Sequence, residues 1–138
     1  MKLILDTNVL VSGIFFGGVP GQILTAWADE QVSLVLSPAI LDEYARVGAE
    51  LAAKHSERRA ALVAVLDLIT VNATIVNATP LATRVSADPA DDVFLAAAMS
   101  SGARLIVSGD RHLLDVSGWQ GIEVVKPREF LDRYLREG

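Results

Sequence analysis

The sequence predicts an α/β protein in which helices cover both faces of a central parallel sheet, giving a three-layer α/β/α sandwich. Short apolar runs rich in β-branched residues alternate along the chain with longer stretches whose apolar residues recur at helical spacing. The runs are apolar at consecutive positions, as is typical of strands that are buried on both faces. Strands that alternate with helices favour one parallel sheet, and we expect a single domain over residues 1–138.

The segments predicted to be strands are short and apolar, and each ends before a polar residue or a glycine. They are residues 2–5, 32–36, 71–76, 104–108 and 122–125. Their lengths are typical of strands in globular domains. We therefore expect all of them to pair in the central sheet.

The predicted helices have start signals or an apolar stripe. Ser37-Pro38 and Asp88-Pro89 each place an N-cap residue before a proline at the first helical position. Gly17-Gly18 is a turn signal that follows the apolar residues 9–16. Helical segments are expected over residues 20–30, 38–47, 52–69, 89–101 and 112–116, and from residue 127 onward.

Two aspartates follow strands that are expected to lie in the same sheet. Asp6 closes the first strand, and Asp110 follows the fourth strand after Ser108-Gly109. In open α/β sheets, ligands bind beyond the carboxyl ends of the strands. One aspartate in such a position can simply start a turn. Two of them predict that carboxylates meet at one edge of the sheet.

Two further acids are expected to reach this edge from helices. Glu43 lies beside the stripe of apolar residues that should face the sheet, and Asp92 precedes an apolar run at the start of a buried helix. Asp88 is expected to cap that helix, since acids favour helix N-termini. The register within the pair Asp91 and Asp92 decides which acid points inward. We expect Asp92 to do so and keep Asp91 as the alternative.

Carboxylates gathered at one edge repel one another unless protons or cations neutralise them. Oxygen ligands select hard cations, so the sequence predicts a Mg²⁺ or Mn²⁺ site. The predicted metal ligands are Asp6, Glu43, Asp92 and Asp110. His55 and His112 have no partner at ligand spacing, and neither is expected to bind the metal. The chain contains no cysteine, which excludes disulfides and thiolate metal sites.

Composition narrows the possible functions and locations. A hydrophobic fraction of 51% and a mean hydropathy of +0.39 predict a folded chain. No apolar run reaches the roughly 18 residues that a membrane span needs. Met1-Lys2 leads directly into a strand, so no signal peptide is expected and a cytoplasmic location fits. The net charge of −5 weighs against an open nucleic-acid-binding surface, and the glycines lack the spacing of a phosphate-binding loop.

Several motifs together resemble those of the PIN-domain nucleases, in particular the toxin components of bacterial and archaeal toxin–antitoxin pairs. In chain order they are LDTNVLVSG from Leu5, SPAILDEY from Ser37, DPADDVFLAAA from Asp88 and VSGDRHLL from Val107. The ending IEVVKPREFL from Ile122 is also similar. Each motif alone is short, but their order and spacing are specific, and the resemblance is spread from residue 3 to about residue 131.

The resemblance implies an acidic pocket at the strand ends and Mg²⁺- or Mn²⁺-dependent cleavage of RNA, frequently by a homodimer. A metal-activated water would attack the phosphorus, and no side-chain nucleophile is needed. A cognate antitoxin protein is the implied partner and would cover the acidic groove. The residues that match the family's acidic quartet are Asp6, Glu43, Asp92 and Asp110. Polar residues expected to orient water or ligands are Thr7, Asn8 and Ser108, with Asp91 as a possible further member.

Other functions stay open on the sequence alone. A Mg²⁺-dependent phosphatase with a similar sheet would have a second acid two residues after Asp6, where this chain has Asn8. A response-regulator receiver domain would have an early pair of acids, which is missing. A PIN-like module that binds RNA or a protein without cutting would be expected to have lost acids, whereas all four are present. Catalysis is therefore the favoured interpretation.

Overall fold

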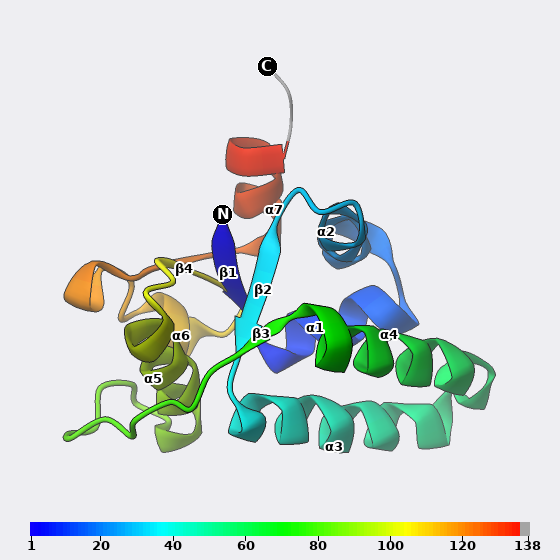
Figure 1. The fold of residues 1–138 in the computed structure, drawn as a ribbon, viewed down its shortest axis with the longest axis horizontal. Coiled ribbons are helices and arrows are strands. Elements are labelled where there is room, and N and C mark those ends of the chain that lie inside the picture. The colour runs from blue at the N-terminus through cyan, green and yellow to red at the C-terminus, as the bar shows by residue number, and fades with distance from the viewer. Residues whose placement is uncertain (136–138) are drawn as a thin grey trace.

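The computed structural model describes residues 1–135, and in this part of the chain five parallel strands form a central sheet (Figure 1). The strands are β1 (Lys2–Leu5), β2 (Ser33–Leu36), β3 (Thr74–Ile75), β4 (Leu105–Val107) and β5 (Glu123–Val125). The predicted α/β class with a parallel sheet is confirmed. Residues 136–138 of the predicted domain lie outside the described residues.

The direction in which strands are added to the sheet reverses at β1. Across the sheet the order is β3-β2-β1-β4-β5. The chain therefore adds β2 and β3 on one side of β1, and then crosses over to add β4 and β5 on the other side. Leu3 of β1 pairs with Leu34 on one side and with Leu105 on the other. The carboxyl ends of β1 and β4 therefore flank a topological switch point, the place where open α/β sheets bind ligands.

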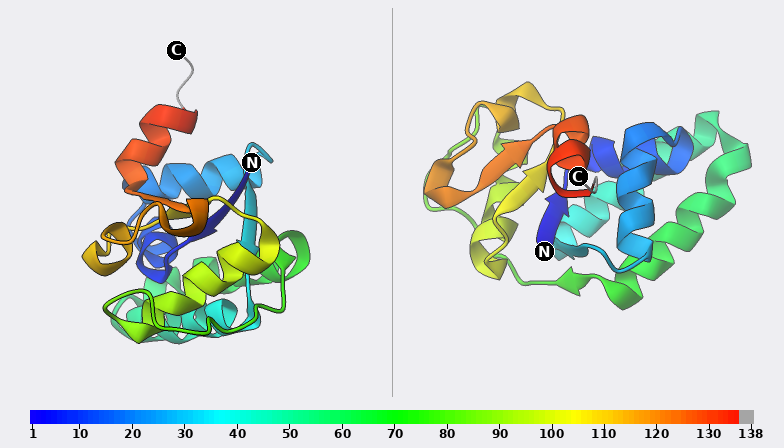
Figure 2. Two further views of the ribbon diagram at one scale, coloured as in Figure 1. Left: turned by 90° about the vertical axis from the view of Figure 1, so that its left-hand side faces the viewer. Right: turned by 90° about the horizontal axis from the view of Figure 1, so that it is seen from above.

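Helices cover both faces of this sheet. The α-helices are α1 (Thr7–Phe15), α2 (Gly18–Ala28), α3 (Pro38–Lys54), α4 (Arg59–Asn72), α5 (Asp92–Ser101), α6 (Arg111–Leu114) and α7 (Pro127–Phe130). Short 3₁₀ helices are η1 (Ser56–Arg58), η2 (Pro89–Asp91) and η3 (Trp119–Gly121), and a π-helical turn, η4, spans Leu131–Leu135. Figure 1 shows α5 and α6 on one side of β1 and β2, with α1, α2 and α4 on the other. The perpendicular views of Figure 2 show the same layers, which explains why consecutive strand residues are buried.

Both predicted pairs of cap residue and proline start helices. The hydroxyl of Ser37 accepts a hydrogen bond from the N–H of Ile40 at 3.3 Å, and α3 begins at the following proline. The carboxylate of Asp88 accepts one from the N–H of Ala90 at 3.0 Å and caps η2, which leads directly into α5. The predicted capping role of Asp88 is confirmed.

The predicted helix 52–69 is wrong in its boundaries, because two helices meet within it. α3 continues to Lys54, and a turn through His55 and η1 leads into α4. The guanidinium group of Arg58 donates two hydrogen bonds, of 3.1 and 2.6 Å, to the carbonyl of Ile14 in α1. This contact between distant segments fixes the turn, and no glycine or proline marks it in the sequence.

The predicted strand 71–76 is shorter than expected. Only Thr74 and Ile75 pair with β2, because α4 continues as far as Asn72. Ile69 of α4 is fully buried in the core, whereas Val71 lies on the surface. Burial of one face of α4 therefore outweighs the strand preference of the β-branched residues at its end.

α1 and α2 form a tight corner. No single helix within residues 1–135 is long and apolar enough to cross a membrane, and only these two taken together, bent by 94°, have the required length and composition.

The corner between α1 and α2 depends on a glycine. A Cβ atom at Gly13 of α1 would lie 2.7 Å from the side chain of Leu24 and 3.0 Å from the backbone of Pro20. Close approach of the two helices therefore requires glycine at this position.

We expect the variant Gly13→Ala to be less stable than Gly21→Ala by about 1–3 kcal/mol, the usual cost of overpacking. Both substitutions gain the same helix propensity. A Cβ at Gly21, however, would make only an ordinary contact of 3.6 Å with the carbonyl oxygen of Gly13. Urea denaturation of both variants measures the difference, and equal free energies of unfolding would contradict this account of the corner.

Candidate metal centre

Asp6 lies directly after β1, at the switch point of the sheet. Its backbone N–H donates to the carbonyl of Val107 in β4 at 2.9 Å, so the sheet holds the residue in place. Only 6% of its surface is exposed. One carboxylate oxygen accepts a hydrogen bond from the N–H of Thr7 and the other from the hydroxyl of Ser108, each at 2.7 Å. Thr7 and Ser108 thereby fix the orientation of this carboxylate.

Glu43 approaches Asp6 from the second turn of α3. The hydroxyl of Thr7 donates to a carboxylate oxygen of Glu43 at 2.6 Å, so Thr7 contacts both acids. The neighbouring Tyr44 is buried, and its hydroxyl donates to the carbonyl of Leu5 at the end of β1. This bond sets the rotation of α3 about its axis over the strand end. Glu43 is consequently directed at the sheet edge, where the sequence predicts it.

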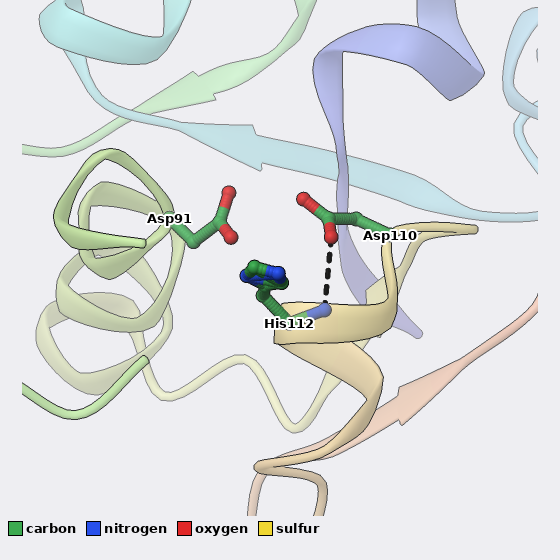
Figure 3. Close-up of side chains that lie close together, drawn as sticks. All are labelled: Asp91, Asp110 and His112. Carbon is green, nitrogen blue, oxygen red and sulfur yellow. Dashed lines mark hydrogen bonds between the residues drawn. The ribbon is translucent and has the colours of Figure 1, made fainter. Parts of the chain in front are cut away.

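Asp91 and Asp92 point in different directions, and the expectation that Asp92 is the inward acid is wrong. The two oxygens of Asp92 accept hydrogen bonds from the backbone N–H groups of Val85 and Ser86, at 3.0 and 2.8 Å. Its carboxylate therefore holds the connector that precedes η2. Asp91 is buried and faces Asp110 instead, as Figure 3 shows. Successive helical residues point about 100° apart, so only one of the two acids can face the strand ends.

Asp110 and His112 come from the turn that starts α6. One oxygen of Asp110 accepts a hydrogen bond from the N–H of His112 at 2.9 Å and so caps this helix. The hydroxyl of Ser108, which donates to Asp6, accepts a bond from the N–H of Asp110 at 2.9 Å. Contrary to the sequence-based expectation, His112 lies beside the acids (Figure 3). A ring nitrogen of His112, a carboxylate oxygen of Asp91 and a carboxylate oxygen of Asp110 all lie within 4.8 Å of one another.

Burial and nearby negative charge disfavour ionisation of Asp6 and Asp91. Burial raises the pKa of Asp91 to about 7, and the nearby charges of Asp110, Asp88 and Asp6 act in the same direction. Burial also raises the pKa of Asp6 above its usual range, although hydrogen bonds to its carboxylate oppose this, and the charges of Asp110 and Glu43 add to the rise. We use the name acidic cluster for Asp6, Glu43, Asp91 and Asp110. A cation bound among them would remove the repulsion.

Two hollows lie beside α3 and α5, and one of them borders this cluster. One, of about 270 Å³, lies between α3 and α5 and has Glu43 in its wall. The other, of about 580 Å³, is lined mainly by small and apolar side chains and reaches Asp92, but it touches no member of the acidic cluster. The smaller hollow therefore adjoins the candidate metal centre.

Asn8 is exposed, and its side chain makes no hydrogen bond within residues 1–135, so the structure gives it no orienting contact.

The donor set of the cluster fits a hard divalent cation. Carboxylate oxygens are the ligands that Mg²⁺ and Mn²⁺ prefer. They come from the ends of β1 and β4, from α3 and from η2, and Thr7 and Ser108 orient the carboxylate of Asp6. Both the charge and the donor atoms of the cluster therefore suit a divalent cation.

Comparison with known protein families gives an independent result. Residues 2–112 match the sequence profile described as the PIN domain, and this span includes the whole acidic cluster. Comparison with curated proteins yields no match. The profile covers well over half of the chain. The acidic cluster within the matched residues lies at the switch point of the parallel sheet. This chain belongs to the PIN-domain family.

Proposed function

We propose that this chain is a Mg²⁺- or Mn²⁺-dependent endoribonuclease that hydrolyses RNA phosphodiester bonds at the acidic cluster, and that it is the toxin of a type II toxin–antitoxin pair. PIN domains are generally nucleases, which supports phosphodiester hydrolysis as the reaction class. The observation that carries the proposal is the meeting of four carboxylates, two of them with raised pKa values, at the switch point of the sheet. Perturbed pKa values of this kind are common at functional sites.

Each member of the acidic cluster would bind the ion from a different element. Asp6 and Asp110 present oxygens from the ends of the neighbouring strands β1 and β4, and Glu43 presents its carboxylate from α3. Asp91 would take the place predicted for Asp92, because Asp91 is buried and lies beside Asp110, whereas the Asp92 carboxylate is turned toward the backbone of Val85 and Ser86. When bound, a divalent ion supplies a water of lowered pKa and neutralises charge on the scissile phosphate. No side-chain nucleophile is then required.

The proposed partners are an RNA substrate, a cognate antitoxin that covers the acidic cluster, and a second copy of the chain, all in the cytoplasm. Exposed apolar side chains support a protein partner, because such groups mark interaction surfaces when they are numerous. Those on and beside α4 are Val63, Leu68, Val71 and Ile75, with exposed fractions of 52%, 48%, 80% and 39%. With a net charge of −5, the chain would depend on the bound cation to hold the RNA phosphates.

The proposed function is tested with single-stranded RNA and Mn²⁺. We expect cleavage by the wild-type chain, loss of cleavage with a chelator, and loss of cleavage in Asp6→Asn. The control is Asp115→Asn, because Asp115 is an exposed acid at the other end of α6 and outside the acidic cluster. We expect this control to cut like wild type.

Two outcomes would contradict the proposal. Cleavage that is unchanged in Asp6→Asn would place the chemistry elsewhere. Binding of Mn²⁺ and RNA without cleavage would instead identify a non-catalytic RNA-binding module. For the toxin role, expression of wild type but not of Asp6→Asn is expected to arrest growth, and co-expression of the neighbouring gene product is expected to restore it.

A further inference from the structure

His112 is placed by its own helix turn to face the acidic cluster. Its backbone N–H donates to Asp110, and the residue after it, Leu113, is fully buried. These two contacts fix the start of α6 and therefore the side of the helix on which the His112 side chain begins. The carbonyl of His112 also accepts a contact of 3.5 Å from the hydroxyl of Ser86, which lies in the connector that Asp92 holds.

The imidazole of His112 lacks a partner in the rest of the described chain. No hydrogen bond or ion pair of its ring occurs within residues 1–135. Figure 3 shows the ring on the same side as the carboxylates of Asp91 and Asp110, with Asp91 facing it from η2. A ring nitrogen lies within 4.8 Å of an oxygen of each acid, a spacing that a single ion can bridge. His55 differs, because its ring packs edge-to-face against the ring of Phe16, with the ring centroids 5.4 Å apart.

We infer that His112 is a ligand of the metal, so that the centre combines one imidazole nitrogen with carboxylate oxygens and favours Mn²⁺ over Mg²⁺. This inference rests on the metal requirement of the proposed function. Imidazole suits transition metals, whereas Mg²⁺ takes oxygen ligands almost exclusively. Because His112 is exposed while Asp91 is buried, the ring would close the site from the solvent side.

The test measures metal binding to the metal-free full chain and needs no activity. Mn²⁺ affinity is measured by electron paramagnetic resonance and Mg²⁺ affinity by calorimetry, for wild type, His112→Ala and the control His55→Ala. We expect His112→Ala to weaken Mn²⁺ binding by about tenfold or more, on the scale of changes around metal ligands. The loss of Mg²⁺ affinity should be much smaller. Electron spin-echo modulation should show ¹⁴N coupling to Mn²⁺ in wild type and in His55→Ala, but not in His112→Ala.

The outcomes separate this inference from the proposed function. Tight Mn²⁺ binding without ¹⁴N coupling would overturn the ligand role of His112 and leave the carboxylate site intact. Equal losses of Mn²⁺ and Mg²⁺ affinity in His112→Ala would also overturn it, because they would indicate a positional effect. Failure of the wild-type chain to bind Mn²⁺ at all would overturn the proposed function as well. Thermal denaturation of each variant confirms that it is folded.

Discussion

Substitution of Asp91 by asparagine is expected to lower Mn²⁺-dependent RNA cleavage by about 100-fold or more. Removal of a neighbour of a metal ligand typically costs about 10–100-fold, and removal of a ligand should cost at least as much. Asp91 is buried and faces Asp110, so it would contribute directly to the site. The rate of cleavage at saturating RNA, measured over a range of Mn²⁺ concentrations, gives the effect.

The matched variant is Asp92→Asn, the neighbouring position. Asp92 accepts hydrogen bonds from two backbone N–H groups, and an asparagine keeps only one acceptor oxygen. We therefore expect a loss of stability of about 1–3 kcal/mol, as for other buried donors left without a charged partner. Cleavage should fall much less than in Asp91→Asn. The reverse order of the two activities would show that Asp92 is the metal-binding acid, as the sequence motif alone predicts.

Stability of the metal-free chain is expected to fall as the pH rises from about 5 to 8. The pKa of Asp91 is raised from an ordinary value of 3.8 to about 7 by burial and by neighbouring acids. A folded-state pKa above the unfolded value means that protonated Asp91 stabilises the fold at low pH. That contribution is lost as the pH rises through about 7. Asp6, whose pKa is also raised, acts in the same direction.

Mn²⁺ should reverse this trend, because the metal needs ionised carboxylates and competes with protons for them. At a concentration 100 times the dissociation constant, binding would stabilise the fold by about 2.7 kcal/mol. We expect the rise in Tm on adding Mn²⁺ to be larger at pH 8 than at pH 5.5. In Asp91→Asn, the dependence of the metal-free Tm on pH should be flatter. A slope that is the same in this variant and in Asp115→Asn would exclude Asp91 as its source.

The sequence predicts the sheet and the strand-end acids well because both depend on local patterns. Consecutive apolar residues identify β1 and β4, and the residues that follow a parallel strand necessarily lie at its carboxyl edge. Asp6 and Asp110 follow from this rule. Glu43 follows from the apolar stripe of α3, since Tyr44 next to it is anchored to the end of β1.

The choice between Asp91 and Asp92 could not be made from the sequence, because it depends on how η2 joins α5. The 3₁₀ turn between Pro89 and Asp91 shifts the phase of the helix that follows. The connector then fixes which way the first residues of α5 point, because the backbone N–H groups of Val85 and Ser86 donate to the carboxylate of Asp92. None of these contacts has a pattern in the sequence.

The position of His112 beside Asp91 and Asp110 does not follow from the sequence, for a related reason. Spacing rules for metal ligands look for histidines in pairs, whereas this histidine is paired with an aspartate two residues earlier. The signal lies in Asp110 itself: as the cap of α6 it accepts a bond from the N–H of His112, and this bond brings the two side chains to the same region. An acid in a capping position followed two residues later by histidine is thus a pattern worth inspecting at strand ends.

The double hydrogen bond of Ser108 has a consequence for how the site is assembled. Because its hydroxyl joins Asp6 to the backbone of Asp110, those two acids form one rigid half that is built into the sheet. Asp91 belongs to a second half, which is carried by the connector and held through Asp92. Substitutions in the connector can therefore change the spacing of the two halves, and with it the affinity for the cation, while the sheet stays as it is.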